Sequence, residues 1–281
     1  VDVVSVWPDE ARWSARTVHE GLGAYFGVDH SGGTLLVAVR RNVLPEAAGP
    51  EGILALDARF ESRGLWYTSP AIRDVHQIRV IGRELWITST GRNVLHVVDL
   101  DTRRTREFAP VPETEADYNH FNTVRWDGER VYVVAHNNGR IPRFAPSELH
   151  VFRWPSMERE ALLSLPSIAA HDVWIEDGTR HVCASIEGAI ATPERPEVHR
   201  LEPFLRGVAV HGRWLVIGRS ELSLRADRSS LDGELLLFDR QERRVAGRFR
   251  LERCGQVHDL LLLGRPDAFA PFREPFLAQA A

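Results

Sequence analysis

The sequence has little cysteine and no long apolar run, and both absences narrow the class of protein. Its 2 cysteines, Cys183 and Cys254, are too few for a disulfide framework and are not spaced as a CxxC pair. No stretch approaches the roughly 18 consecutive apolar residues of a membrane-spanning helix. The beginning of the chain also lacks the basic-then-apolar pattern of a signal peptide. We therefore expect a cytoplasmic protein that does not act in a membrane.

Basic residues are not concentrated in any part of the chain. The formal net charge is −4, and the arginines are scattered. Binding to a nucleic-acid backbone requires a concentrated basic face, so this pattern argues against a nucleic-acid partner. With 43% hydrophobic and 26% charged residues over 281 positions, the composition is typical of a soluble globular protein with an ample core.

A repeated phrase runs along most of the chain. It consists of a polar residue, an alternating apolar strand, a turn with Gly, and a second strand that ends in a polar residue. A second phrase between the copies, such as NVLHVVDLDTRRTREF, supplies two further strands, so each unit is predicted to have four. A half copy, HDLLLLGR, begins at His258. Five full copies begin at Tyr25, His76, Asn122, His171 and Arg206.

The spacing of the copies predicts the fold. Successive copies begin 51, 46, 49, 35 and 52 residues apart, close to the length of a four-stranded propeller blade. The 24 residues from His258 onward and the 24 residues before Tyr25 would together complete one more blade. We predict an all-β protein in which residues 1–281 form a single β-propeller domain of six four-stranded blades, closed by both termini; five blades is the alternative count. No segment sustains helical periodicity, which argues against a parallel α/β fold.

This phrase structure resembles the six-bladed propellers of the NHL, strictosidine synthase and SMP-30 lactonase group. The resemblance covers nearly the whole chain and rests on the shape of the repeat. The lactonases of this group hold a divalent cation in the pore with Glu, Asn and Asp. The chain departs from that pattern because Tyr25 stands where they have a carboxylate, and only Asn122 is a match.

The residues that open the inner strands are predicted to meet at one mouth of the central channel. Inner strands of a propeller run alongside the channel and begin at the face that carries the functional loops. The second strand of each blade returns to this face, so its last residues form an outer polar shell. That shell consists of Asn42, Thr90, Asn137, Glu187 and Arg219.

Histidine recurs at this mouth. A single histidine at a strand start is usually structural, whereas three at equivalent positions favour a shared role. Neutral imidazoles select Fe(II), Zn, Cu or Ni over Mg and Ca. An all-histidine site on a propeller axis is similar to that of the carotenoid-cleavage oxygenases, which hold Fe(II) with four histidines. We predict a metal site, for Fe(II) first and Zn next, with Asn122 as an alternative to His120 in the ligand set His76, His120, His171 and His258.

Arg206 stands where the repeat elsewhere has a histidine, so the fifth unit offers a fixed positive charge. We predict that it binds a carboxylate or phosphate group, assisted by Arg219; an ion pair with Glu187 or Glu221 is the alternative. Glu187 is the candidate general base.

Other polar residues have predicted roles at or near the same mouth. Tyr25 is a further catalytic candidate, and Asn122 and Asn137 are candidates for substrate binding. His136 is assigned either to the surroundings of the site or to a simple turn. The two aspartates after His171 and His258 are predicted to turn away from the channel and to form hydrogen bonds between blades: Asp172 and Asp259.

These predictions lead to one function and one alternative. The first is a metal-dependent enzyme that acts on a small anionic metabolite at the channel mouth, by oxygenase, lyase or hydrolase chemistry. The alternative is a non-catalytic propeller that binds a ligand or a protein and has structural histidines, since propellers host both kinds of function. A rim of imidazoles and amides, with few exposed aromatic residues, favours the enzyme. The expected partner is a small-molecule substrate, and the sequence does not predict an oligomeric state.

Overall fold

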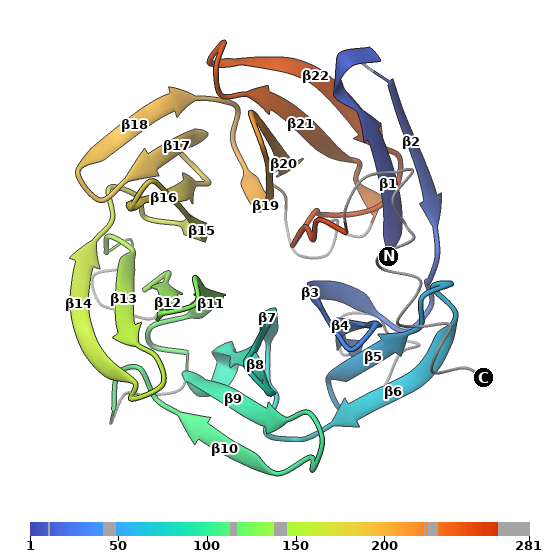
Figure 1. Cartoon of the computed structure of the whole chain (residues 1–281), viewed down its shortest axis with the longest axis vertical. Helices are drawn as coiled ribbons and strands as arrows, with labels where there is room; N and C mark the ends of the chain where they lie inside the picture. Colours follow the sequence, from blue (N-terminus) through green and yellow to red (C-terminus); the bar gives the residue numbers. More distant parts are fainter. Residues whose placement is uncertain are drawn as a thin grey trace.

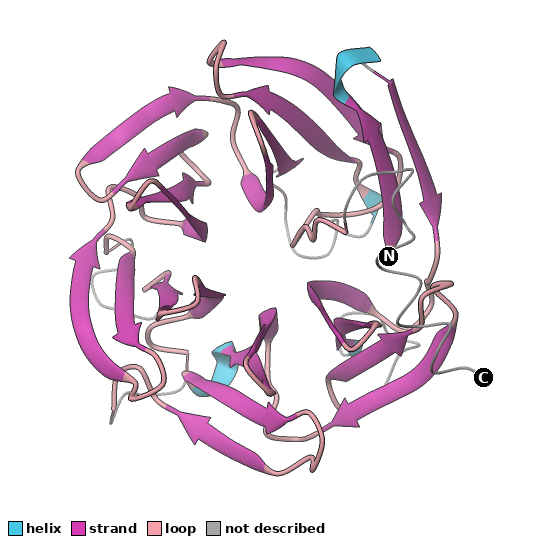
Figure 2. Cartoon of the chain, in the orientation of Figure 1, coloured by secondary structure: helices cyan, strands magenta, loops and turns pink. Residues whose placement is uncertain are grey.

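The computed structural model describes residues 1–10, 12–41, 49–112, 117–137, 145–221, 223 and 230–263. Within them the chain forms five four-stranded antiparallel sheets around a central axis, together with one two-stranded sheet (Figure 1). Regular structure is almost entirely strand, joined by turns and short 3-10 segments (Figure 2). The prediction of an all-β propeller is thus confirmed. In the part of the chain that the structure describes, no helix has the length and apolar character needed to cross a membrane.

Each complete blade is a meander whose first strand lies nearest the axis (Figure 1). The first blade contains β3 (Ala24–Ser31), β4 (Thr34–Arg40), β5 (Gly52–Leu56) and β6 (Ser62–Thr68). The second contains β7 (Val75–Ile81), β8 (Glu84–Ser89), the 3-10 turn η3 (Thr90–Arg92), β9 (Val94–Asp99) and β10 (Thr105–Phe108). The third contains β11 (Phe121–Trp126), β12 (Arg130–Ala135), β13 (Glu148–Arg153) and β14 (Glu158–Ser164). The fourth contains β15 (Ala170–Glu176), β16 (Thr179–Ala184), β17 (Ala189–Thr192) and β18 (Arg195–Arg200). The fifth contains β19 (Leu205–His211), β20 (Trp214–Ser220), β21 (Gly233–Asp239) and β22 (Arg244–Leu251).

Segments from both ends of the chain occupy the sixth place in the ring. The hairpin of β1 (Asp2–Trp7) and β2 (Arg12–Thr17), joined by η1 (Pro8–Glu10), lies at the periphery between β22 and β6, and residues 256–263 run inside it (Figure 1). The Trp13 ring stacks on Phe249 of β22, with centroids 5.4 Å apart. The Val28 amide donates to Asp259 Oδ2 over 3.1 Å. The ring is therefore closed by segments from both termini, and the count of five describes its complete blades.

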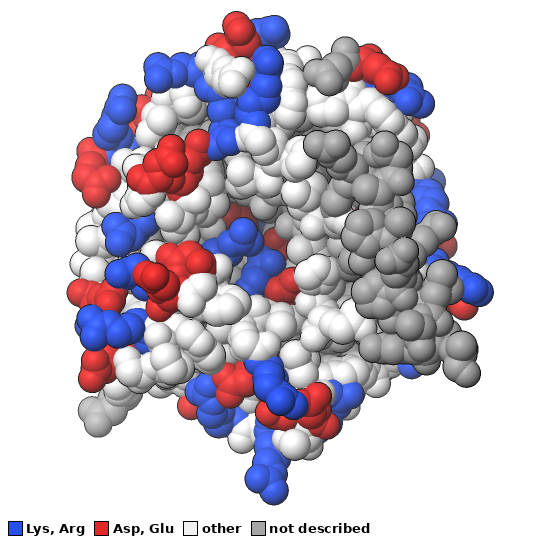
Figure 3. Space-filling view, viewed as in Figure 1, with Lys and Arg blue, Asp and Glu red and all other residues white. Residues whose placement is uncertain are grey.

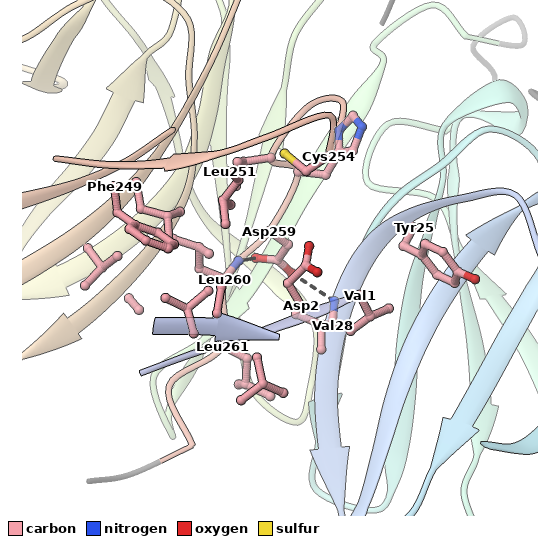
Figure 4. Close-up of a pocket in the computed structure, with 18 of the residues that line it drawn as sticks. Val1, Asp2, Tyr25, Val28, Phe249, Leu251, Cys254, Asp259, Leu260 and Leu261 are labelled. Atoms are coloured by element: carbon pink, nitrogen blue, oxygen red, sulfur yellow. Dashed lines mark hydrogen bonds between the residues drawn. The ribbon is translucent and has the colours of Figure 1, made fainter. Parts of the chain in front are cut away.

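A cavity of about 1970 Å³ lies in this sixth place, between the hairpin, β3, β22 and the C-terminal segment. Its lining includes Val1, Tyr25, Phe249 and Leu261, which surround it from four different segments (Figure 4). It is adjacent to the channel, because Phe26 and His258 also contribute to its lining.

Apolar side chains pack between neighbouring blades. Between the first and second blades, for example, Ile53, Ile78 and Ile87 are completely buried in one cluster. Each such side chain contributes about 1.5–3 kcal/mol by leaving water. Because apolar side chains alternate along each strand, both faces of a blade are apolar and each packs against a neighbouring blade. This packing on both faces closes the repeat into a ring.

All five inner strands share an irregularity near their start. The pairing of each inner strand with the second strand of its blade slips there by a residue, at the following places: between Tyr25 and Val28, Val75 and Ile78, Phe121 and Thr123, His171 and Val173, and Arg206 and Val208. A β-bulge of this kind breaks the alternation of side chains and re-aims them. Consecutive residues of one strand can therefore both approach the axis.

The bulges bring residues of non-adjacent blades into contact across the axis. Gln77 Nε2 of the second blade donates to Asp172 Oδ1 of the fourth over 2.9 Å and to Asp259 Oδ1 in the sixth place over 3.3 Å. The prediction that these aspartates turn away from the channel was therefore wrong, because it assumed an unbroken alternation. Their predicted bonds between blades are confirmed: Asp172 Oδ2 accepts the Gly207 amide over 2.6 Å, and Asp259 Oδ2 accepts the Val28 amide.

Candidate functional site

Imidazoles from several blades gather at the ends of the inner strands, and we call them the histidine cluster: His76, His120, His136, His171 and His258. Neighbouring ring centroids lie 4.8 Å apart for His76 and His120, 5.3 Å for His120 and His136, and 5.2 Å for His136 and His171. The ring of His258 stacks on Phe26 at 4.0 Å, and Phe26 meets His76 edge to face. The cluster therefore follows the rim of the channel from blade to blade.

The local structure of the second blade fixes the orientation and tautomer of His76. Its Nδ1 lies 2.8 Å from the Asp74 carbonyl oxygen and 3.0 Å from Thr90 Oγ1. The Thr90 hydroxyl donates its own hydrogen to the Phe121 carbonyl over 2.6 Å, so it can only accept from the imidazole. Both partners therefore require a hydrogen on Nδ1. The other nitrogen, Nε2, is left as a basic acceptor on the opposite side of the ring.

His171 has the same setting two blades further on. Its Nδ1 lies 3.1 Å from the Ala169 carbonyl oxygen and 2.8 Å from Ser185 Oγ. The Ser185 hydroxyl donates to the Leu205 carbonyl over 2.5 Å. The hydroxyl residue follows its histidine by 14 positions in both blades. The repeat therefore builds the same hydrogen-bonded imidazole twice.

Burial keeps the imidazoles of His76, His136 and His171 neutral. It lowers the pKa of His76 well below the usual value, and His120 and Arg40 lower that pKa further. Burial, followed by the charges of Arg206 and His136, likewise lowers the pKa of His171 well below the usual value. The pKa of His136 falls to about 3, again chiefly through burial. These rings therefore present neutral nitrogens near neutral pH.

Fixed positive charge lies beside these neutral rings. Arg206 is 8% exposed, and its NH1 lies 3.4 Å from His258 Nδ1. Its guanidinium stands over the Phe204 ring at 4.5 Å. A second guanidinium, that of Arg40, stands over the Phe26 ring at 4.4 Å and is paired with Asp74. Neutral imidazoles beside a buried guanidinium suit an anionic ligand better than a cation.

A polar layer lies next to the cluster, because Gln77, Asp172 and Asp259 each follow a histidine directly. Burial raises the pKa of Asp172. Burial also raises the pKa of Asp259 to about 7; Arg79 acts to lower this pKa and Asp172 to raise it. Arg79 NH2 lies 3.8 Å from Asp259 Oδ2. Basic side chains with acidic neighbours gather in the hollow at the centre of the ring (Figure 3).

The predicted metal ligands lie in one cluster but do not form a metal site. Among the residues that the structure describes, no three His, Cys, Asp or Glu side chains are placed to hold a metal ion. His258 is stacked on Phe26 with its Nδ1 toward Arg206, and His120 Nδ1 contacts Asp117 Oδ1 at 2.6 Å. The donor set of His76, His120, His171 and His258 therefore does not fit a bound metal in this geometry.

Two of the predicted catalytic residues have other partners. Tyr25 packs in the first blade, where its Oη lies 2.8 Å from His19 Nδ1, and Phe26 takes the place beside the histidines. Glu187 accepts the Ser167 hydroxyl over 2.8 Å and the Ile168 amide over 3.2 Å. These contacts fix a loop, so the geometry gives Glu187 no contact with the histidine cluster.

The predicted substrate-binding residues other than Arg206 also make contacts within the fold. Arg219 lies 3.1 Å from Glu202 and 3.2 Å from Glu234, so its guanidinium is paired within the fold. Asn122 donates to the Ala170 carbonyl over 2.9 Å, and completely buried Asn137 donates to the Pro146 carbonyl over 2.9 Å. Asn122 thus ties the third blade to the fourth.

One sequence signal would have located the remaining residues of the site. The positions that open the inner strands and those that end the second strands are 14 apart in every complete blade: Phe26 and Arg40, His76 and Thr90, Asn122 and His136, His171 and Ser185, Arg206 and Ser220. The sequence prediction placed the first member of each pair except Phe26 at the channel mouth. It left the role of His136 open between the surroundings of the site and a simple turn. Reading the pairs together shows that the third blade has Asn122 at the first position and a histidine, His136, at the second.

Comparisons with known proteins bear on the fold. No protein-family model matches the chain, and no curated protein matches its sequence. A solved structure described as a candidate gluconolactonase has a TM-score of 0.64 at 11% identity and covers 90% of this chain and 85% of its own. Regucalcin from Agrobacterium tumefaciens has a TM-score of 0.54 at 11% identity, with 84% and 76% coverage. Virginiamycin B lyase from Staphylococcus aureus has a TM-score of 0.50 at 10% identity, with 83% and 93% coverage. The chain therefore has the β-propeller fold seen in these structures, as the resemblance of its repeat implied.

Proposed function

We propose that the histidine cluster and Arg206 form the active site of an enzyme that acts on a small anionic metabolite by proton transfer. The observation that carries this proposal is the repeated setting of His76 and His171 beside a buried guanidinium. Arg206 would hold a carboxylate or phosphate group through its planar fork. A neutral Nε2, of His171 or His76, would then accept a proton from the substrate or from water.

Hydrolase and lyase chemistry are the first to test, since a candidate gluconolactonase and a virginiamycin B lyase share the fold. In hydrolysis of a lactone, the oxygen of water forms a bond to the carbonyl carbon while the imidazole takes the proton of the water. The ring C–O bond then breaks, and the proton passes to the leaving oxygen. In an elimination, the same imidazole takes a proton from carbon while the leaving group departs.

A transition metal, Fe(II) first and Zn next, stays a prediction of the sequence. The described residues do not form its site, and the charge of Arg206 opposes a dication next to neutral rings. No step above uses a metal. Elemental analysis of protein purified without nickel affinity or chelators, before and after anaerobic loading with Fe(II) or Zn, tests this prediction directly.

The anion site is tested with Arg206→Lys, because lysine keeps the charge but loses the fork. We expect calorimetry to show that the parent protein binds D-gluconate or inorganic phosphate. Arg206→Lys should bind the same anion at least tenfold more weakly, while its Tm stays nearly that of the parent. Arg219→Lys is the matched control, because Arg219 pairs with Glu202 and Glu234. His171→Ala should retain binding of inorganic phosphate and lose turnover of 6-phospho-D-glucono-1,5-lactone, a lactone that carries the required anionic group, followed with a pH indicator. Equal losses of stability and affinity in Arg206→Lys, or no binding and no turnover in the parent, would contradict the proposal.

A further inference from the structure

His136 is the imidazole in the cluster that no hydrogen bond explains. It is 9% exposed, and neither of its ring nitrogens has a hydrogen-bond partner in the part of the chain that the structure describes. Its ring lies between those of His120 and His171, at 5.3 Å and 5.2 Å. The backbone there is well fixed, because the His136 amide donates to the His120 carbonyl over 3.1 Å.

Other blades have paired side chains at the equivalent position. The Thr90 and Ser185 hydroxyls each hold a histidine and donate to the next blade. Ser220 Oγ accepts the Val257 amide over 2.9 Å. A buried polar group without a hydrogen-bond partner destabilises the folded state, so an imidazole at this position does not contribute to stability through a hydrogen bond. Unpaired buried groups of this kind are typical of functional sites.

The chemistry of a neutral imidazole defines what its partner would be. It presents one N–H donor and one lone-pair acceptor, and burial keeps it neutral by lowering its pKa to about 3. A hydroxyl or an amide also offers both a donor and an acceptor, whereas a carboxylate offers only acceptors. The His136 ring lies 5.2 Å from that of His171, which in turn meets Phe204 edge to face, and the Arg206 guanidinium stands over Phe204. His136 is therefore on the side of the cluster that leads to the anion position.

We propose that His136 contacts the ligand of this site and recognises a hydroxyl or amide group next to the anionic group held by Arg206. This inference rests on the proposed function and adds a contact residue that binds the uncharged part of the ligand.

The test compares His136→Phe with His136→Gln. Phenylalanine fills the space without polar atoms, whereas glutamine keeps one donor and one acceptor. We expect urea unfolding to show His136→Phe as stable as the parent or more stable. Calorimetry should show its affinity for D-gluconate at least tenfold lower, with its affinity for hexanoate, which has the carboxylate and no hydroxyls, unchanged. His136→Gln should bind D-gluconate within a few-fold of the parent.

A control variant and two outcomes separate this inference from the proposed function. His150→Phe, in β13 of the same blade, should change stability without changing affinity for D-gluconate. If Arg206→Lys weakens binding and His136→Phe leaves it unchanged, the function stands and the inference is overturned. If the parent binds neither D-gluconate nor hexanoate, the stability of His136→Phe is the deciding measurement. A variant less stable than the parent would show that the imidazole is structural and would overturn the inference. A variant more stable than the parent would support a residue kept for function.

Discussion

At the scale of single residues, the same side chain has different tasks according to its neighbours. His76 and His171 are held at Nδ1 by a carbonyl and a hydroxyl, which leaves Nε2 as a neutral acceptor. His258 instead stacks on Phe26 and faces Arg206. Their positions in the repeat predicted that they approach one another, but only hydrogen-bond partners decide which nitrogen faces the channel.

The pKa of Asp259 predicts a pH dependence of stability. Burial raises it to about 7 in the folded protein, above about 3.9 in an unfolded chain. Between these values the folded state holds a proton that the unfolded state has released, so this residue makes stability fall as pH rises through that window. Asp259→Asn removes this contribution. We expect the free energy of unfolding of the parent, minus that of the variant, to decrease with rising pH in urea titrations.

The buried histidines change stability with pH in the opposite direction. The test therefore compares the parent with Asp259→Asn at each pH and does not rely on the stability of the parent alone. Burial lowers the pKa of His136 to about 3, so the unfolded state binds protons more readily below the usual histidine pKa, and stability rises with pH there. This contribution is common to the parent and to Asp259→Asn. A difference that is flat or rises with pH would contradict the raised pKa of Asp259.

At the scale of elements, the inner strands owe their role to the bulge near their start. Plain alternation would send His171 and Asp172 to opposite sides, yet the slip between His171 and Val173 lets both approach the axis. The bulge also brings the backbones of neighbouring inner strands close together. A Cβ on Gly27, for example, would lie 2.4 Å from the Ile78 nitrogen.

Gly27→Ala tests this close approach. The added methyl group would meet the Ile78 nitrogen and, at 2.7 Å, the Gln77 backbone, and a backbone within a sheet cannot give way as a flexible side chain can. We expect a loss of about 1–3 kcal/mol of stability in urea unfolding, as for other overpacked sites. The control is Gly247→Ala in β22, where the nearest atom, Trp13 Cζ2, lies at an ordinary 3.5 Å. Equal losses of stability from the two substitutions would show that β3 and β7 are not packed as closely as this structure has them.

At the scale of the whole molecule, the ring depends on contacts between distant parts of the chain. Val28 is 231 residues from Asp259, whose carboxylate accepts its amide. The Trp13 ring covers Phe249 at the edge of the fifth blade. A propeller opened at this place would expose the edges and apolar faces of two blades to water.

Deletion of residues 1–20 tests the closure. It removes β1 and β2 and uncovers Phe249, so the remaining blades lose a neighbour on each side of the sixth place. We expect the truncated protein to lose cooperative unfolding, measured by circular dichroism in urea and on heating. Trp13→Ala, which removes one ring but keeps the hairpin, should retain a cooperative transition with a lower midpoint. A truncated chain that melts like the parent would rule out this role for the hairpin.

The sequence by itself determined the blade pattern and the positions that open the inner strands, because apolar alternation and turn residues are local properties of the chain. It therefore predicted a ring closed by both termini and His76, His171, His258 and Arg206 near one end of its channel. The tertiary structure decided what these residues contact. Gln77 meets Asp172, 95 residues away, and Asp259, 182 residues away, only after every blade is in place. Bulge direction, the tautomers and the lack of a metal cluster among the described residues all depend on such contacts, which no local pattern encodes.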